Sequence, residues 1–145
     1  REVDLAGRYR DLLAGSPGSV VSAARIIADA GRHAVVFHCA AGKDRTGVLA
    51  AVVLDAVGVP ADAIVEDYAL SGQRLDRVRQ RLVKLPSYRG LPPVRTGYLG
   101  VEAVVMRRFL TTLRAEFGGG AQWLLQHGFG AAELRGLRDT LVEPV

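Results

Sequence analysis

The chain has 145 residues, of which 49% are hydrophobic, and its mean hydropathy of +0.16 fits one globular domain with a single core. Its longest apolar run, Val48 to Val59, contains Asp55 and is shorter than the roughly 20 residues of a membrane-spanning helix, so we expect a buried helix there. One cysteine excludes an internal disulfide, so the sequence does not distinguish a cytoplasmic from a secreted protein. The net charge of +4 comes mainly from arginine, which favours an anionic partner.

The first part of the chain predicts two helices and one strand. Apolar residues recur at helical spacing over residues 5–13, and Ser16-Pro17-Gly18-Ser19 separates this helix from a second one at about 20–30. Residues 34–38 are rich in valine and phenylalanine, and they predict the one strand of the chain.

The remaining elements are predicted to be helices, and the third of them carries arginines around a narrow apolar stripe. A loop with three prolines precedes the fourth, on which apolar residues recur every four positions. We expect these helices at residues 46–57, 61–70, about 72–85, 101–117, 122–127 and 131–142.

A single strand cannot satisfy its own backbone hydrogen bonds. The predicted fold class is therefore α/β, with a sheet that contains parallel strands and is flanked by helices. This chain would supply one strand, at residues 34–38, and mostly helices. The other strands would lie in a missing N-terminal segment or in a second chain that completes the sheet.

The cysteine lies between the predicted strand and the buried helix. A strand, a loop and a helix start in this order gather backbone N–H groups that can hold a phosphate, and the helix dipole adds to this field. The same field lowers the pKa of the Cys39 thiol and makes it a nucleophile. Arg45 can hold two phosphate oxygens at once, and the Thr46 hydroxyl can donate to the thiolate.

Two other interpretations of this segment are weaker. An inert core cysteine would not require Arg45 at this spacing or the small residues of the loop. A nucleotide-binding loop of the Walker type would place serine or threonine after Lys43, where this chain has Asp44.

The ten residues from His38 to Gly47, HCAAGKDRTG, resemble the His-Cys-x5-Arg-Ser/Thr-Gly signature of the protein tyrosine phosphatase superfamily. The form AGKDRTG, followed by a buried helix and Asp67-Tyr68, most resembles the bacterial tyrosine and dual-specificity phosphatases that also accept phosphoinositides. The resemblance extends from about Tyr9 to the C-terminus, but only the ten-residue signature is specific. It implies that residues 1–145 are the C-terminal portion of a single phosphatase catalytic domain with a phosphate loop at residues 38–47.

In that family a cysteine thiolate attacks phosphorus, and water then hydrolyses the cysteinyl-phosphate without a metal or another cofactor. Carried over by position, Cys39 is the nucleophile and Arg45 is the phosphate clamp. The residues expected to bind the substrate phosphate are Ala40, Ala41, Gly42, Lys43 and Thr46.

Three carboxylates are candidates for the general acid. Asp44 lies inside the loop, and family members with the sequence GKDRT have been interpreted as using this aspartate as acid and then as base. Its alternative role is to anchor the loop through backbone N–H groups. Asp4 and Asp11 lie upstream at a suitable distance, but the helix predicted there makes them more typical of surface carboxylates.

The predicted substrates are phosphotyrosine and, beyond it, phosphoserine, phosphothreonine or phosphoinositide monoesters. By the resemblance Lys43 contacts a second phosphate, although a lysine at this position could equally face solvent. The basic helix near residues 72–85 allows peripheral membrane contact, and helices 61–85 are candidates for a lid over the thiol. No nucleic-acid partner is expected, because interleaved aromatics are missing. The alternative function is a catalytically inactive module that binds phosphate or a phosphopeptide.

Overall fold

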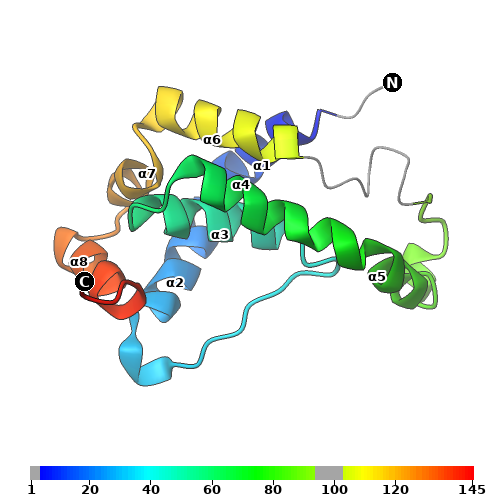
Figure 1. Cartoon of the computed structure of the whole chain (residues 1–145), viewed down its shortest axis with the longest axis horizontal. Coiled ribbons are helices and arrows are strands. Elements are labelled where there is room, and N and C mark those ends of the chain that lie inside the picture. Colours follow the sequence, from blue (N-terminus) through cyan, green and yellow to red (C-terminus); the bar gives the residue numbers. More distant parts are fainter. Residues whose placement is uncertain (1–3, 94–102) are drawn as a thin grey trace.

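The computed structural model describes residues 4–93 and 103–145, which form helices joined by connections of different lengths, the one between residues 32 and 44 being long (Figure 1). The elements are α1 (Leu5–Gly15), α2 (Pro17–Ala28), η1 (Ala30–Arg32), α3 (Asp44–Ala56), α4 (Ala61–Leu70), η2 (Ser71–Arg74), α5 (Leu75–Leu82), η3 (Pro86–Tyr88), α6 (Ala103–Phe117), α7 (Gly120–Gln126) and α8 (Ala131–Leu141).

The prediction of an α/β fold is wrong for this chain, because its described residues contain neither a strand nor a sheet. Residues 34–43, which include the predicted strand, connect η1 to α3 and pass outside the helices (Figure 1). The side chains of Val36 and Phe37 are 87% and 38% exposed. A strand exists only through hydrogen bonds to a neighbouring strand, and β-favouring residues alone do not provide that neighbour.

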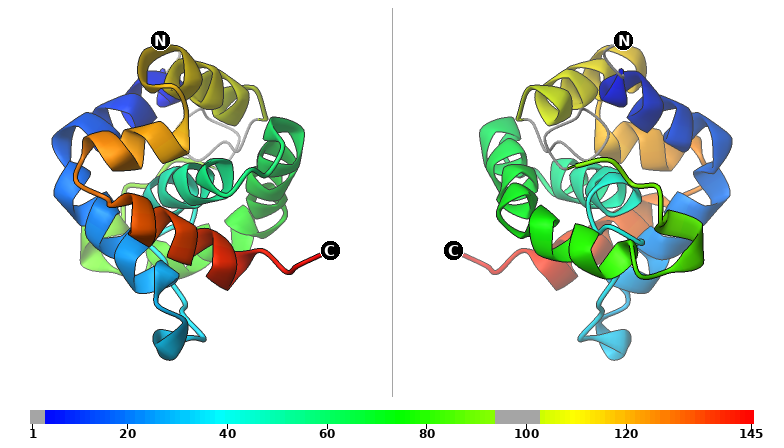
Figure 2. Two further views of the ribbon diagram at one scale, coloured as in Figure 1. Left: turned by 90° about the vertical axis from the view of Figure 1, so that its left-hand side faces the viewer. Right: turned by 90° about the vertical axis from the view of Figure 1, so that its right-hand side faces the viewer.

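The predicted buried helix is α3, and it lies at the centre of the structure with the other helices around it (Figure 2). It packs against α1, α2, α4 and α7. Buried residues occur on several sides of α3, as the uninterrupted apolar sequence indicated: Val48, Ala51, Val52, Val53 and Ala56. Because α3 begins at Asp44, this central helix starts inside the predicted phosphate loop.

Glycine makes the close contact between α3 and α7 possible. A Cβ atom on Gly120 would lie 2.3 Å from the carbonyl oxygen of Val52, so no larger residue fits there without movement. The Gly120 N–H also donates to Asp55 Oδ2 at 2.7 Å, and Arg114 of α6 pairs with the other oxygen of the same carboxylate. Asp55, the one charged residue of the apolar run, therefore joins three helices.

The helix boundaries differ from the predicted ones by a few residues. The helix at 61–70 is confirmed as α4 with the same bounds, whereas α5 ends at Leu82, before the proline-containing loop. The helix predicted to start at Val101 is described from Ala103 onward as α6, and Val101 itself lies outside the described residues.

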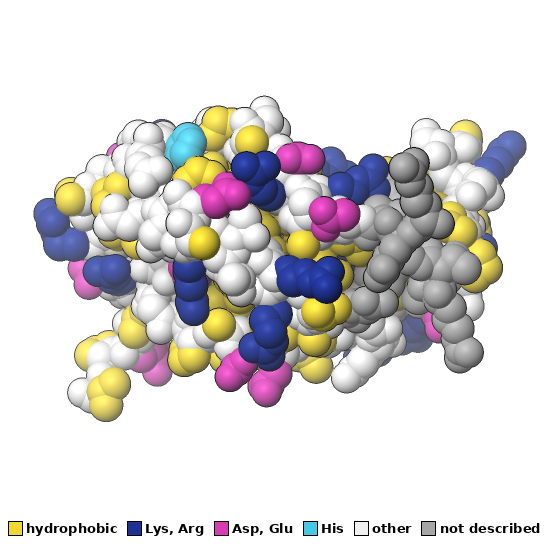
Figure 3. Space-filling view, turned by 90° about the horizontal axis from the view of Figure 1, so that it is seen from above, with side chains coloured by type: hydrophobic (Ala, Val, Ile, Leu, Met, Phe, Trp, Pro, Cys, Tyr) yellow, Lys and Arg dark blue, Asp and Glu magenta, His cyan; other side chains and the backbone are white. Residues whose placement is uncertain are grey.

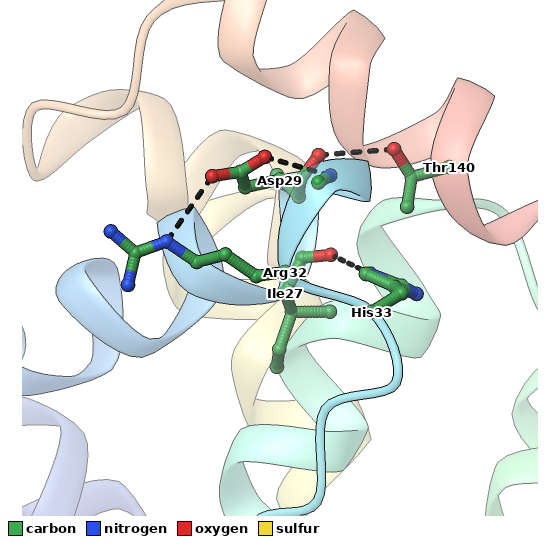
Figure 4. A network of polar contacts seen from close by, with 7 residues as sticks. Ile27, Asp29, Arg32, His33 and Thr140 are labelled. Carbon is green, nitrogen blue, oxygen red and sulfur yellow. Dashed lines mark hydrogen bonds and ion pairs between the residues drawn. The ribbon is translucent and has the colours of Figure 1, made fainter.

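Polar contacts fix the chain where it leaves α2 (Figure 4). Asp29 caps η1 and pairs with Arg32, and His33 Nε2 lies 2.8 Å from the carbonyl oxygen of Ile27. Thr140 of α8 donates to the carbonyl of the last α2 residue at 3.0 Å. The exposed connection to α3 therefore starts from a well-anchored turn.

Charged side chains of both signs are interspersed over the face that carries α1 and α6 (Figure 3). Arg10 of α1 pairs with Glu116 of α6, and Arg107 of α6 pairs with Asp62 of α4. Exposed pairs of this kind contribute at most about 1 kcal/mol each, so they order this face more than they stabilise the fold. Within residues 4–93 and 103–145, no helix has both the length and the apolar character required to cross a bilayer.

Candidate active site

The loop between the exposed connection and α3 surrounds the sulfur of Cys39 with hydrogen-bond donors. Gly42 has a φ of +69°, a left-handed conformation that turns the backbone before α3 begins. Burial raises the pKa of the Cys39 thiol, but hydrogen bonds from the Thr46 side chain and from the backbone N–H groups of Thr46, Gly42 and Lys43 lower it by more. The net result is a pKa of about 7, against an ordinary value of 9.0.

The oxygen of the Thr46 hydroxyl is buried, and no atom of the described residues is placed to form a well-aligned hydrogen bond with it. The contact of this hydroxyl with the sulfur nevertheless helps to lower the pKa of the Cys39 thiol. Ionisation of Cys39 provides the acceptor that this hydroxyl requires, so the site favours the thiolate over the thiol.

Asp44 opens α3 and accepts two hydrogen bonds on the same oxygen. The Tyr9 hydroxyl of α1 donates to Asp44 Oδ1 at 2.7 Å, and Lys43 Nζ donates to Oδ1 at 2.7 Å. The Lys43 side chain is 0% exposed, whereas that of Asp44 is 34% exposed. Two buried groups thus hold the carboxylate of Asp44, which is still partly exposed to solvent.

One interpretation of the sequence had Lys43 facing solvent. In the structure its ammonium group is instead buried against Asp44. Burial of a lysine is costly unless its charge is compensated, and the neighbouring carboxylate supplies that compensation.

Arg45 lies in the first turn of α3 and is exposed. It borders a groove of about 510 Å³ between α1 and the start of α3, which Arg8, Asp11 and Asp44 also line. A second, more apolar groove of about 270 Å³, lined by residues of α1, α2 and α3, also includes Arg45. The guanidinium is therefore at the surface beside the loop, where a phosphorylated ligand can approach it.

The remaining predicted loop residues stay together in the structure. Ala40, Ala41 and Gly42 lie between Cys39 and the start of α3, and the ring nitrogen Nδ1 of His38 lies 3.2 Å from the Cys39 carbonyl oxygen. His38 therefore contacts the loop backbone.

The two upstream carboxylates have different positions. Asp4 caps α1 by accepting a hydrogen bond from the Gly7 N–H at 2.9 Å, which is a structural role. Asp11 is exposed on α1 and lines the larger groove together with Asp44. Of the three carboxylates considered from sequence, Asp44 is the one next to the loop that holds Cys39.

The described residues contain no group of three or more His, Cys, Asp or Glu side chains placed to hold a metal ion. A site made of a thiolate, backbone amides, a guanidinium and a carboxylate can bind a phosphate group, supply a nucleophile and exchange a proton.

A family model described as "Tyrosine phosphatase family" matches residues 1–143. This chain belongs to the tyrosine phosphatase family. The family assignment confirms the resemblance that the ten-residue signature suggested.

Three curated relatives of this tyrosine phosphatase family member match different shares of the chain. Triple specificity protein phosphatase PtpB of Mycobacterium tuberculosis is 34% identical over 120 residues, which is 74% of this chain and 44% of that protein. A candidate tyrosine-protein phosphatase of Cupriavidus necator is 32% identical over 138 residues, 95% of this chain and 43% of that protein. A tyrosine-protein phosphatase of Nostoc commune is 56% identical over 43 residues, 30% of this chain and 15% of that protein. The chain spans less than half the length of each of these relatives.

Sequence reasoning about this family member missed the contacts that Tyr9 and Tyr68 make with the site. Tyr9 entered the sequence analysis as part of the helical pattern over residues 5–13 and as the start of the family resemblance, and Tyr68 entered as part of the Asp67-Tyr68 pair; neither was linked to the site. Tyr9 and Asp44 are separated by 35 positions, so no local pattern links them. A buried tyrosine in an apolar stripe usually has a partner for its hydroxyl, and this rule is the signal that could have pointed to a polar contact.

Proposed function

We propose that this protein is a cysteine-dependent phosphatase that hydrolyses phosphotyrosine through a cysteinyl-phosphate intermediate. The observation that carries the proposal is the Cys39 thiol, whose pKa is about 7 because backbone amides and a threonine hydroxyl converge on it. A sulfur in this state is a nucleophile at neutral pH, and the amides beside it suit the oxygens of a phosphate.

In the first step the Cys39 thiolate attacks phosphorus, so that the S–P bond forms and the P–O bond to the leaving group breaks. The Asp44 carboxyl group gives its proton to the departing oxygen. In the second step the Asp44 carboxylate takes a proton from water while that water attacks phosphorus. The S–P bond then breaks, and inorganic phosphate leaves with the thiolate restored.

Arg45 and the loop amides stabilise the charge on the phosphoryl oxygens during both steps. The exposed position of Arg45 at the groove supports this role, since a guanidinium there can hold two oxygens of an incoming phosphate. Ala40, Ala41, Gly42 and Lys43 contribute backbone N–H groups, and the Thr46 hydroxyl stabilises the sulfur as a leaving group.

Phosphoserine, phosphothreonine and phosphoinositides are proposed as further substrates. The larger groove beside Asp44 and Arg45 supports a broad substrate range because it opens on one side of the loop. In this proposal a second phosphate on an inositol ring contacts Lys43 only if the ammonium group first leaves Asp44, because the side chain is buried in the structure.

Among the helices at 61–85, which were candidates for a lid, we assign the role of covering the Cys39 thiol to α5. Ile64, Val65 and Tyr68 of α4 are buried in the core, whereas α5 packs mainly against η2 and extends from the bundle (Figure 1). Its arginines suit an anionic membrane surface that carries a phosphoinositide. If deletion of residues 71–85 in a folded protein leaves the rate of Cys39 oxidation by peroxide unchanged, this role is excluded.

The deciding experiment measures phosphate release from a panel of phosphotyrosine, phosphoserine and phosphoinositide substrates, with wild type and Cys39→Ser compared. We expect turnover by the wild type, no turnover by the variant, and a trapped cysteinyl-phosphate in a single turnover of the wild type. Binding of phosphopeptide without release or trapping would instead identify an inactive binding module.

The proposed role of Asp44 has its own test. Asp44→Asn should slow hydrolysis of an alkyl phosphate far more than hydrolysis of an activated aryl phosphate, whose leaving group needs little protonation. Equal losses on both substrates would assign Asp44 to loop structure.

A further inference from the structure

A chain of three side chains from three helices ends on the carboxylate of Asp44. The hydroxyl of Tyr68 in α4 lies 2.8 Å from the hydroxyl of Tyr9 in α1, and Tyr9 donates to Asp44 Oδ1 at 2.7 Å. A phenol has only one proton to donate, and Tyr9 directs its proton to the carboxylate. Tyr68 is therefore the donor in the contact between the two hydroxyls.

Both tyrosines are fixed within the core. Tyr9 is 1% exposed and Tyr68 is 5% exposed. The ring of Tyr9 packs edge-on against Tyr68 and against Phe109 of α6, with centroid distances of 6.2 and 6.0 Å. Such packing leaves the hydroxyl of Tyr9 little freedom to move away from Asp44.

Gly47 of α3 provides the space that brings Tyr68 to this position. A Cβ atom at residue 47 would lie 3.1 and 3.2 Å from two ring carbons of Tyr68, closer than ordinary side-chain contacts. The glycine that ends the signature HCAAGKDRTG thus lies directly against the ring of Tyr68. This contact links the phosphate loop to α4.

We propose that Tyr9 and Tyr68 are positioning residues that orient Asp44 for proton transfer, an inference that rests on the proposed role of Asp44 as acid and base. The Tyr9 and Lys43 hydrogen bonds both end on Oδ1 and so hold one oxygen of the carboxylate. The proton to be transferred is then carried by Oδ2, whose direction is set by the rigid contacts at Oδ1. Neither tyrosine touches the substrate in this role.

The phenol of Tyr9 remains a neutral donor while Asp44 changes its protonation state. Burial, followed by the hydrogen bonds with Tyr68 and Asp44, raises the pKa of Tyr9 well above its ordinary value of 10.0. The charged or titratable groups around Asp44 are Lys43 beside it, Arg45 after it, and Arg8 and Asp11 on the groove wall formed by α1. Tyr9 is thus an uncharged contact among several charged ones.

The test compares Tyr9→Phe and Tyr68→Phe with wild type on two substrates, an alkyl phosphate and an activated aryl phosphate. We expect Tyr9→Phe to lower kcat on the alkyl phosphate by about three- to tenfold, and to change kcat on the aryl phosphate by less than about twofold. Tyr68→Phe should show the same pattern with a smaller loss, because it acts through Tyr9. Tyr88→Phe, in η3 and away from both grooves, is the matched control and should change neither value.

A double-mutant cycle separates this role from a general loss of stability. In the Asp44→Asn background, Tyr9→Phe should cause no further loss on the alkyl phosphate, because the group that it positions can no longer transfer a proton. Equal losses on both substrates, or losses that add to those of Asp44→Asn, would overturn the positioning role. If Tyr9→Phe does not fold, Tyr68→Phe is tested in the same cycle with the same two outcomes.

The two proposals fail in different ways. If Asp44→Asn shows the leaving-group dependence and neither tyrosine variant does, only the positioning role is overturned. If Asp44→Asn itself loses activity equally on both substrates, the acid assignment is wrong, and the positioning role is overturned with it.

Discussion

At the scale of single residues, opposing effects determine the charge on Cys39. Burial favours the neutral thiol, and the donors of the loop and of Thr46 favour the thiolate by a larger amount, so the pKa is about 7. Hydrogen bonds from the loop amides and from the Thr46 hydroxyl are thus the causes of this lowering.

The hydroxyl of Thr46 provides a direct test of this balance. In wild type, the rate of Cys39 alkylation by iodoacetamide should rise with pH to a midpoint near 7, because only the thiolate reacts. Thr46→Val removes one donor to the thiolate, so the pKa should rise toward 9.0 and alkylation at pH 6 should be several-fold slower. Thr111→Val, at an exposed position of α6, should leave the midpoint unchanged. An unchanged midpoint in Thr46→Val would show that the hydroxyl does not act on the sulfur.

Lys43 and Lys84 are the two lysines of the chain, and they form a matched pair because one is buried and the other exposed. Lys43→Met leaves the Asp44 carboxylate without its cation, although Asp44 remains partly solvated and bonded to Tyr9. We expect the free energy of unfolding in urea to fall by about 1 to 3 kcal/mol. Lys84→Met should change it by less than about 0.5 kcal/mol. Similar values for the two variants would mean that the buried pair adds no stability.

At the scale of elements, the run of apolar residues was sufficient to predict α4 and most of α3, because both helices contribute buried apolar residues to the core. The local preference of residues 34–38 for a strand, in contrast, led to a wrong prediction. Val36 and Phe37 favour a strand locally, but no described segment pairs with them. The burial of Lys43 also could not be predicted, since it depends on a carboxylate that Tyr9 holds from a distant helix.

The contact between α3 and α7 is tested by two glycine substitutions of opposite expected sign. Gly120→Ala places a methyl group 2.3 Å from the Val52 carbonyl oxygen, and we expect it to reduce the free energy of unfolding by about 1 to 3 kcal/mol. Gly136→Ala lies within α8 with open space around its Cβ position, so it should raise that free energy by roughly 0.5 to 1 kcal/mol. Chemical denaturation of both variants measures the difference. A stabilising Gly120→Ala would refute the close contact between the two helices.

At the scale of the whole molecule, the site is assembled from residues that the fold brings together from distant helices. The signature from Cys39 to Thr46 could be found in the sequence because the loop is continuous. The sequence could not reveal the contributions of Tyr9, Tyr68 and the groove wall formed by α1. Only the packing of α1 and α4 around α3 brings these residues to the loop.

Inorganic phosphate should stabilise the whole protein, because a ligand that binds only the folded state raises the free energy of unfolding. At a phosphate concentration of about 100 times Kd the gain is roughly 2.7 kcal/mol, which should raise Tm by several degrees. Cys39→Ser keeps the loop amides and should retain the shift, whereas Arg45→Ala should lose most of it. A Tm that does not respond to phosphate in wild type would contradict a preformed loop.

The start of α3 at Asp44 means that one helix serves both the interior of the protein and its chemistry. A substitution along α3 therefore faces two independent requirements during evolution, and few changes satisfy both. The exposed residues of α1 along the groove, such as Arg8 and Asp11, and those of α5 outside the bundle carry fewer such requirements. We expect related proteins to diversify their substrate preference through these outer helices while the central helix changes slowly.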